Sequence, residues 1–496
     1  MAKRRTSPVS RRAFLSGTAT VSAAAIVGRG VYSVLDDFVN VQPAYAATVV
    51  ARDEEQYLID SIELITDNST VLAVPPIYND VFTAKLNPAT TWNRSALQNA
   101  QQRLEAALKY VEAPYPSTAA GLTLVVSWGL PYFRTYVPAP WQAKAPRDTS
   151  LPLVNGQRQL AVLDAITFPS DPPGVVLEDN HVAFKIRSSS SQILHTAESQ
   201  LFADTSSPGY VGDLFQLTSK RIGFLGRGFG TTSVCKTLAL AAGVPGASSI
   251  PDKSQLSLGF TSTQVAALGP DNIPSFETLR GVTDQFPGGY FAHGCAMHLS
   301  HLYLDLAGWY GKSYAERVKR MMSPETAVPS DPSTVTLPNG PAQVATLAQV
   351  KADAANPQLA VRGGHNSLLQ MATRLKNDQL DNYGRLRRAG TAVPVREDFN
   401  TLDNPFSWYV DSNGNVQQPT ANQPGLHFAV FIPSSGKFHA ARMAMDGVLP
   451  DGTNLRSQYG LTDEQIGFNS AMRATHRQNF LLPPRSHRSF PLAELL

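Results

Sequence analysis

Cysteine is almost absent from this chain: Cys235 and Cys295 are the only two among 496 residues. Structural zinc and iron–sulfur sites that take four cysteines from one chain are therefore excluded. A single disulfide, between these two thiols, is the most that the composition allows.

An excess of charge of one sign is also missing. The 42 lysines and arginines nearly balance the 39 aspartates and glutamates, which leaves a net charge of +3. Proteins that bind nucleic acid usually carry a strong basic excess on one face, so we expect no nucleic-acid partner. No apolar run after residue 46 is long enough to cross a bilayer, so no stable membrane span is expected there.

The common hydrolase and nucleotide-binding motifs are absent. There is no G-x-S-x-G elbow, no H-E-x-x-H helix and no P-loop. The run Gly226-Arg-Gly-Phe-Gly230 partly resembles a phosphate-binding loop, but no strand, helix and ribose-binding acid surround it, and we interpret it as a turn. Any chemistry must therefore be sought in less familiar patterns.

The first 46 residues predict an export signal. Arg11 and Arg12 precede Phe14 and Leu15, and a mild apolar run follows to Gly28. Paired arginines before Phe-Leu are typical of the twin-arginine route. The segment Ala44-Tyr45-Ala46 has the A-x-A pattern of a cleavage site, with cutting expected after Ala46. The mature protein is then expected in the periplasm, in the cell wall or outside the cell, although an uncleaved anchor helix is the alternative.

The remaining chain alternates between strand and helix patterns. Helices are expected over 93–111, 190–202, 305–322 and 437–446, and strands over 121–128, 182–187, 215–224, 288–302 and 426–432. This succession favours an α+β fold made of two ferredoxin-like, split βαβ halves with antiparallel sheets, arranged like a dimeric α+β barrel. We place the halves at 47–240 and 255–450 and interpret 451–496 as a C-terminal tail packed over the body.

Two sets of histidines are candidates for a site. The first is His293, His298 and His301; alternation along a strand puts His298 on the face opposite to the other two, which opposes a metal site shared by all three. The second is His365, in Arg362-Gly-Gly-His-Asn366, with the cluster Arg385-Leu-Arg-Arg388 after it. A neutral imidazole is a usual haem ligand, and an arginine across the haem could stabilise charge as a peroxide bond breaks.

A resemblance supports the second set. The segments Phe286-Pro-Gly-Gly-Tyr290, Leu302 to Trp309, Arg385-Leu-Arg-Arg388 and Gly425 to Pro433 follow one another as similar segments do in the dye-decolorising peroxidase superfamily. The resemblance covers roughly residues 255–447 and implies a haem b cofactor. It also implies that His365 is the proximal iron ligand and that Arg387, or else Arg385, is the distal arginine.

The chain departs from that family at one position. The family usually has G-x-x-D-G, with an aspartate over the haem, whereas Leu258-Gly-Phe-Thr-Ser262 stands here. Ser262 takes the place of the aspartate, and a hydroxyl is a poor base near neutral pH. Loss of a proton shuttle typically costs on the order of 10²–10⁴-fold in rate.

Three functional hypotheses follow from these patterns. The leading one is an exported haem peroxidase-like protein that takes peroxide and a small-molecule reductant. The reductant would be oxidised at the haem edge or at surface tyrosines and tryptophans such as Trp309 and Trp408. The second is a haem-binding or haem-free scaffold of the same fold without turnover. The third is a metalloenzyme that uses His293, His298 and His301. An oligomer is compatible with all three.

Overall fold

The computed structural model describes a set of ranges that together cover most of the chain. They are residues 32, 35, 44–46, 51–59, 63–67, 70–226, 234–252, 254–260, 273–328, 344–402, 409–410, 416–417 and 423–496.

The N-terminal half is a ferredoxin-like unit. Its strands are β3 (Tyr78–Leu86), β4 (Thr123–Gly129), β6 (Val182–Ser188) and β7 (Phe215–Phe224). Helix α3 (Arg94–Glu112) connects β3 to β4, and α6 (Ser191–Glu198) connects β6 to β7. The spatial order is β7-β3-β6-β4, and every neighbouring pair is antiparallel. This is the strand order of a split βαβ unit.

The C-terminal half repeats the same order. Strand β8 (Cys295–Leu304) lies between β15 (Gly425–Ile432) and β16 (Met472–Leu482), and β15 also pairs with the short strands β11 (Val395–Arg396) and β12 (Phe399–Thr401). Helix α11 (His365–Thr373) lies in the connection from β8 to β11, and α12 (Ser435–Met445) connects β15 to β16. The two halves therefore have the same topology.

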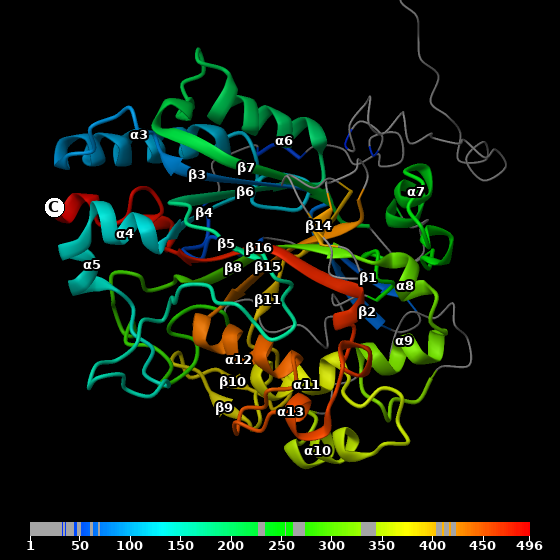
Figure 1. Ribbon diagram of the computed structural model, residues 1–496. Coiled ribbons are helices and arrows are strands. Elements are labelled where there is room, and N and C mark those ends of the chain that lie inside the picture. Colours follow the sequence, from blue (N-terminus) through cyan, green and yellow to red (C-terminus); the bar gives the residue numbers. More distant parts are fainter. Residues whose placement is uncertain are drawn as a thin grey trace, which may run out of the picture.

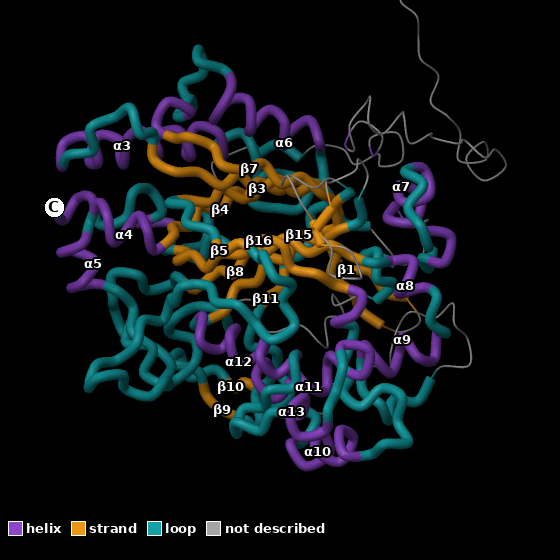
Figure 2. The backbone as a smooth tube through the Cα atoms, viewed as in Figure 1, coloured by secondary structure: helices purple, strands orange, loops and turns teal. Residues whose placement is uncertain are grey.

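Two joints close the halves into one barrel. Strand β16 pairs with β4 through Phe480 and Leu481, and β12 pairs with β7 where Asn400 lies opposite Phe224. The fully buried Asn400 amide also donates to the Phe224 carbonyl at 3.1 Å. Figures 1 and 2 show the strands as two layers between α3 and α6 on one side and α11 and α12 on the other. The predicted α+β barrel of two ferredoxin-like halves is confirmed by this pairing.

The alternation of side chains in the strands produces two separate cores. In β6, Val182, Phe184 and Ile186 pack outward in the cluster that contains the helices, whereas Ala183 points into the barrel. The barrel interior is lined by small and aromatic groups from both halves: Val81, Val125, Ala183, Met297, Leu299, Phe399, Ala429, Phe431 and Phe480. Helix α3 begins after Asn93, whose side chain accepts from the Ala96 amide, and buries Leu97, Leu104 and Leu108.

The other elements are short and lie outside the barrel ring, apart from β5, which pairs with β16. They are β1 (Glu63–Asp67), β2 (Thr70–Val74), α4 (Leu130–Tyr136), α5 (Pro138–Lys144), β5 (Val176–Leu177), α7 (Val234–Ala241), α8 (Leu306–Tyr310), α9 (Tyr314–Met321), α10 (Leu347–Ala355), β9 (Gln379–Leu380), β10 (Leu386–Arg387), β13 (Tyr409–Val410), β14 (Val416–Gln417) and α13 (Leu455–Tyr459).

Several expectations from the sequence need correction. The segment 451–496 is not a covering tail, because it contains β16, which lies between β4 and β8 within the sheet. The helix expected over 305–322 is two helices, since α8 ends before Gly311 and α9 begins after Ser313. The strand expected from residue 288 starts only at Cys295. The two cysteines form no disulfide with each other, because they lie in different cores, Cys235 among the helices and Cys295 inside the barrel.

Only five residues of the predicted export signal are described: Tyr32, Leu35 and 44–46. Tyr32 is buried, and its hydroxyl donates to the Asp80 carboxylate at 2.5 Å and to the Gly223 carbonyl at 2.9 Å. The Arg11-Arg12 pair lies outside the described residues, so the export route stays a prediction. Across the ranges given above, no helix has both the length and the apolar character needed to traverse a bilayer.

Closure by β16 can be tested with a truncation of one interior side chain. Phe480 is fully buried inside the barrel. Replacement by alanine is expected to lower the free energy of unfolding by about 3–5 kcal/mol, because it removes packed apolar area and leaves a cavity. Leu495→Ala, at a side chain 45% exposed, is the control and should change it by less than about 0.5 kcal/mol. Equal small effects in urea unfolding would argue for a loosely packed tail.

Candidate functional site

Two glycine-dependent contacts fix the position of His365. The residue begins α11, and the preceding Gly364 packs so tightly that a Cβ there would lie 2.4 Å from the Met322 carbonyl oxygen. On the other side, Gly467 has φ +51° and its Cβ position would be 3.4 Å from the His365 backbone. A side chain at Gly364 would displace the start of α11. The Gly-Gly-His sequence is thus explained by close backbone approach.

The His365 imidazole is held neutral. Its ring lies 4.5 Å from the Phe468 ring, and its Nδ1 is buried with no hydrogen-bond partner. Burial, together with the charges of Arg396 and Arg442, lowers the pKa of His365 to about 3. A buried ring nitrogen without a partner is unfavourable by on the order of 1–3 kcal/mol. The same neutral imidazole is suited to ligate a metal or haem iron.

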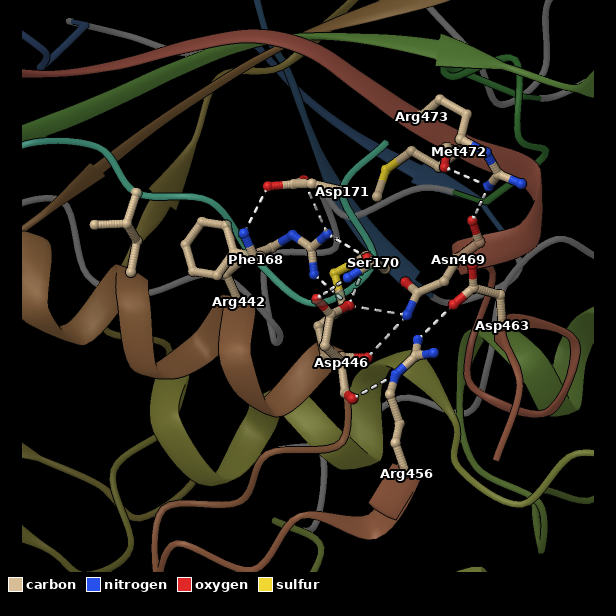
Figure 3. Close-up of polar contacts among 12 residues, drawn as sticks. Phe168, Ser170, Asp171, Arg442, Asp446, Arg456, Asp463, Asn469, Met472 and Arg473 are labelled. Atoms are coloured by element: carbon tan, nitrogen blue, oxygen red, sulfur yellow. Dashed lines mark hydrogen bonds and ion pairs between the residues drawn. The ribbon is translucent and has the colours of Figure 1, made fainter. Parts of the chain in front are cut away.

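Two arginines act on this imidazole. Besides burial, the charge of Arg396 in β11 lowers the pKa of both His365 and Arg374, the residues at the two ends of α11. Arg442, in α12, pairs with Asp446 at 2.5 Å and lies 3.8 Å from Asp171. Figure 3 shows the Arg442 side chain directed at Asp446 and the loop of Ser170 and Asp171. The charge of Arg442 is thus balanced by carboxylates, whereas Arg396 is exposed.

The arginines predicted from the sequence lie in a different environment. Arg387, in β10, is buried and donates to Asp381 at 2.8 Å, and Arg385 donates to the same carboxylate at 3.2 Å. These contacts, and the donated bond of the Arg385 backbone, hold the pKa of Asp381 below its ordinary value against its burial. Arg280 and Asn382 tie this hairpin to the loop around Glu277.

Among the described cations, those whose charge acts on His365 are Arg396 and Arg442, and Arg387 is not one of them. Sequence reasoning missed Arg396. Arg396 lies in β11, which pairs with β15, and no local sequence pattern encodes that pairing. The sequence instead indicated the arginine-rich segment 385–388, because of its spacing from His365.

The other predicted participants are placed differently. Ser262 and Trp408 lie outside the described residues. Trp309 is fully buried, and its indole nitrogen donates to the Leu258 carbonyl at 2.9 Å. Electron transfer at the surface would require an exposed ring. Trp309 is therefore a core residue, which corrects its suggested role at the surface.

The first histidine set is dispersed by the structure. His293 precedes β8 in a left-handed conformation (φ +66°) and contacts Glu55 at 3.0 Å. His298 points outward and stacks on Phe438 of α12, whereas His301 points into the barrel, as the alternation predicts. Within the described ranges no group of histidines, cysteines and carboxylates has an arrangement that could hold a metal ion.

A different row of histidines lies inside the barrel. His301 of β8 is directly opposite His427 of β15 on one side and His476 of β16 on the other. Both ring nitrogens of His427 are buried without a hydrogen-bond partner. Burial, with the nearby Arg221 charge, lowers the pKa of all three below the usual value, and that of His476 to about 3. His476 escaped notice because its segment had been interpreted as a tail.

The strand order and the His365 region define a class, an α+β barrel protein with two ferredoxin-like halves and a buried histidine at the start of a covering helix. A family model, described as a family of unknown function (DUF7405), matches residues 89–484. The chain belongs to this family. No curated protein matches the chain.

Solved structures with a similar fold include three from bacteria. DypB from Rhodococcus jostii RHA1 is 12% identical, with a TM-score of 0.45, over 84% of this chain and 96% of that one. The encapsulated DyP-type peroxidase from Mycobacterium smegmatis is 13% identical, with a TM-score of 0.41, over 84% and 98%. A dye-decolorizing protein from V. cholerae is also 13% identical, with a TM-score of 0.42, over 84% and 97%.

The histidine row predicts sensitivity to acid. The folded-state pKa values of the three histidines lie below the unfolded value of about 6.5. Below that pH, the histidines of the unfolded chain therefore bind protons, whereas those of the folded protein stay neutral. The associated stability is present above pH 6.5 and is lost as the pH falls below it, by at most about 1.4 kcal/mol per histidine per pH unit. Urea unfolding at pH 7.0 and 5.5 should show this loss.

A matched pair of variants isolates the cause. His427→Leu should reduce the loss of stability between pH 7.0 and 5.5, since it removes one buried titrating group. His195→Gln, at a side chain 53% exposed, should not reduce it. A wild-type free energy of unfolding that is unchanged between the two pH values would contradict the assignment of neutral buried histidines.

Proposed function

We propose that this protein is an exported, haem-binding protein with a peroxidase-like function, in which the imidazole of His365 ligates the iron. The observation that carries the proposal is the state of that imidazole. It is neutral, its Nδ1 is buried without a partner, and close packing at Gly364 fixes the start of the helix that carries it.

The surrounding residues fit the group in charge as well as in ligand type. Haem b carries two carboxylates, and the cationic group of Arg374 at the end of α11 is suited to receive one of them. A bound haem would supply iron-centred oxidation of a small-molecule reductant by hydrogen peroxide. The protein would contribute the axial ligand, an arginine for a haem carboxylate and exclusion of water by Phe468.

An arginine near the reacting oxygen atoms would stabilise the negative charge that develops there. Arg396 is the better candidate for this role, because its charge already reaches His365 and it is exposed, whereas Arg387 is neutralised by the buried Asp381. Arg387 and Arg385 remain the candidates that the sequence resemblance implies. The proton-transfer role of Ser262 also remains a prediction from that resemblance.

The second candidate function is haem binding without turnover, or a scaffold that has lost haem. It is favoured by the serine at position 262, since a hydroxyl cannot replace a carboxylate as a base near neutral pH. Haem content and peroxide-dependent dye oxidation, measured on the same preparation, separate the candidates. Haem without turnover indicates binding alone, and absence of haem indicates a scaffold.

Haem ligation by His365 has a direct spectroscopic test. The wild-type protein, isolated or reconstituted with haemin, is expected to show a Soret band. His365→Ala should abolish or strongly shift this band, because the axial ligand is removed. His195→Ala is the control at a half-exposed histidine outside the site, and it should leave the spectrum unchanged. A wild type that stays colourless after reconstitution would end the proposal.

The identity of the working arginine can be decided by a matched comparison. In haem-loaded protein with measurable turnover, Arg396→Leu is expected to reduce peroxide-dependent dye oxidation by about 10²–10³-fold, the usual cost of losing a group that stabilises developing charge. Arg387→Leu should reduce it much less at equal haem content. The opposite ranking would favour Arg387 as the distal arginine. Haem content measured in each variant excludes loss of cofactor as the cause.

A further inference from the structure

A buried ion cluster lies inside the barrel, separate from His365. In β6, Lys185 and Arg187 share the inward face with Ala183. Lys185 lies 3.0 Å from one carboxylate oxygen of Glu397, and Arg187 Nη1 lies 2.5 Å from the other. The side chains of both cations are 2% exposed. The single carboxylate of Glu397 thus pairs with two buried cations.

Only one of the three guanidinium nitrogens of Arg187 has a partner. Nη1 binds Glu397, but Nε and Nη2 are buried and have no hydrogen-bond partner. These two nitrogens form one edge of the planar group, and their N–H bonds run nearly parallel. Two parallel donors of this kind match two oxygens of a carboxylate, phosphate or sulfate. An unsatisfied charged donor is among the most unfavourable groups to bury.

A further polar group without a partner lies beside this edge. Thr123 of β4 is directly opposite Arg187 of β6, so both side chains leave the sheet on the same face with Cβ atoms about 5 Å apart. The hydroxyl of Thr123 is likewise buried and without a partner. On the other side of Arg187, Asn79 uses its amide for the carbonyls of Pro76 and Ile77. Two buried polar side chains with unpartnered atoms therefore leave neighbouring strands on the inward face of the barrel.

The charges around the cluster favour an anion. Lys185 and Arg187 exceed the contacting carboxylate Glu397 by one positive charge. Asp398 lies near enough to raise the pKa of Lys185, but it makes a smaller contribution than Glu397 does and has no ion pair with either cation. Burial and the neighbouring Arg187 charge lower the pKa of Lys185 to about 8, although Glu397 acts in the opposite direction. Val125, Ala183 and Phe399 belong to the apolar cluster of the same barrel interior.

We propose that the barrel interior beside Arg187 is a binding site for a small oxyanion, held by Arg187 Nε and Nη2 with the Thr123 hydroxyl. The ligand class is an inorganic phosphate or sulfate, or the carboxylate of a small organic acid. The site is built by the N-terminal half and by Glu397 of the C-terminal half, so an occupant would link the two halves. It does not depend on haem or on His365.

The first test is a titration of the full-length protein. Sulfate, phosphate and acetate are added at constant ionic strength, balanced with chloride, and binding is measured by calorimetry and by the thermal unfolding midpoint. The wild type is expected to show saturable binding of at least one of these oxyanions. General stabilisation by sulfate does not saturate and serves as the baseline.

Variants at the two orphaned groups make the test specific. Arg187→Lys keeps the charge but loses the paired donors, and is expected to weaken binding about ten-fold or more. Thr123→Val, which is nearly the same shape, should weaken it several-fold while the protein stays folded. Arg134→Lys, at a pair with Asp164 on the surface, is the matched control and should bind like the wild type.

The second test identifies the occupant. Ion chromatography of protein denatured after export would detect phosphate or sulfate, and mass spectrometry would detect an organic acid. Crystals soaked in selenate should give an anomalous peak beside Arg187. Saturable binding that is lost in Arg187→Lys, or a peak at this position, supports the site. Absence of both saturable binding and an anomalous peak, or equal binding by wild type and Arg187→Lys, overturns it.

Discussion

Closure of the barrel is the constraint on which the rest of the structure depends. Each half presents a sheet edge that the other half covers, β12 against β7 and β16 against β4. An open sheet edge leaves unpaired backbone groups, and closure removes them. It also isolates an interior from water. The neutral histidine row and the ion cluster at Glu397 both owe their properties to that isolation, because low polarity penalises a charged imidazole and strengthens an ion pair.

The outer face of the C-terminal half has a different character. Helices α11 and α12 pack against each other there, and a polar network joins Arg442 of α12 and Asp446, which caps this helix, to Asp171 (Figure 3). Arg477 pairs with the same Asp171 carboxylate. This network anchors a long loop of the N-terminal half to the other half. His365 lies at the start of α11, so its position is set by helix packing rather than by the sheet. The two proposed sites are therefore held by different parts of the fold. The site at His365 is held by the covering helices, and the site beside Arg187 is held by the strands of the barrel.

Most of the fold could be predicted from the sequence because the strand segments are marked by apolar or alternating runs. The segments 215–224 and 426–432 form β7 and β15; β15 is an apolar run buried along almost its whole length, whereas β7 also has exposed positions. Residues 472–482 were misinterpreted for a physical reason. This strand is rich in polar residues such as Thr475, His476 and Gln478, which are buried among partners inside or beside the barrel and so hide the usual hydrophobic signal.

The candidate site could be predicted only in part. His365 was selected from its glycine context, and the structure explains that context by close contacts at Gly364 and Gly467. The arginine that acts on it could not be found from spacing alone. A charge that reaches across from β11 depends on how α11 packs on the sheet, and no local pattern encodes that packing. The buried cluster of Lys185, Arg187 and Glu397 could not be predicted from the sequence either, because Lys185 and Arg187 resemble the exposed positions of an amphipathic strand.

The position of β16 has a consequence for biosynthesis. It follows every other strand of the ring in the chain, yet it lies between β4 and β8. Until the ribosome has released residues 472–482, the first half carries an open β4 edge and β8 lacks one neighbour. Open edges of this kind can pair with a second copy instead, so correct assembly depends on the whole polypeptide being available at once.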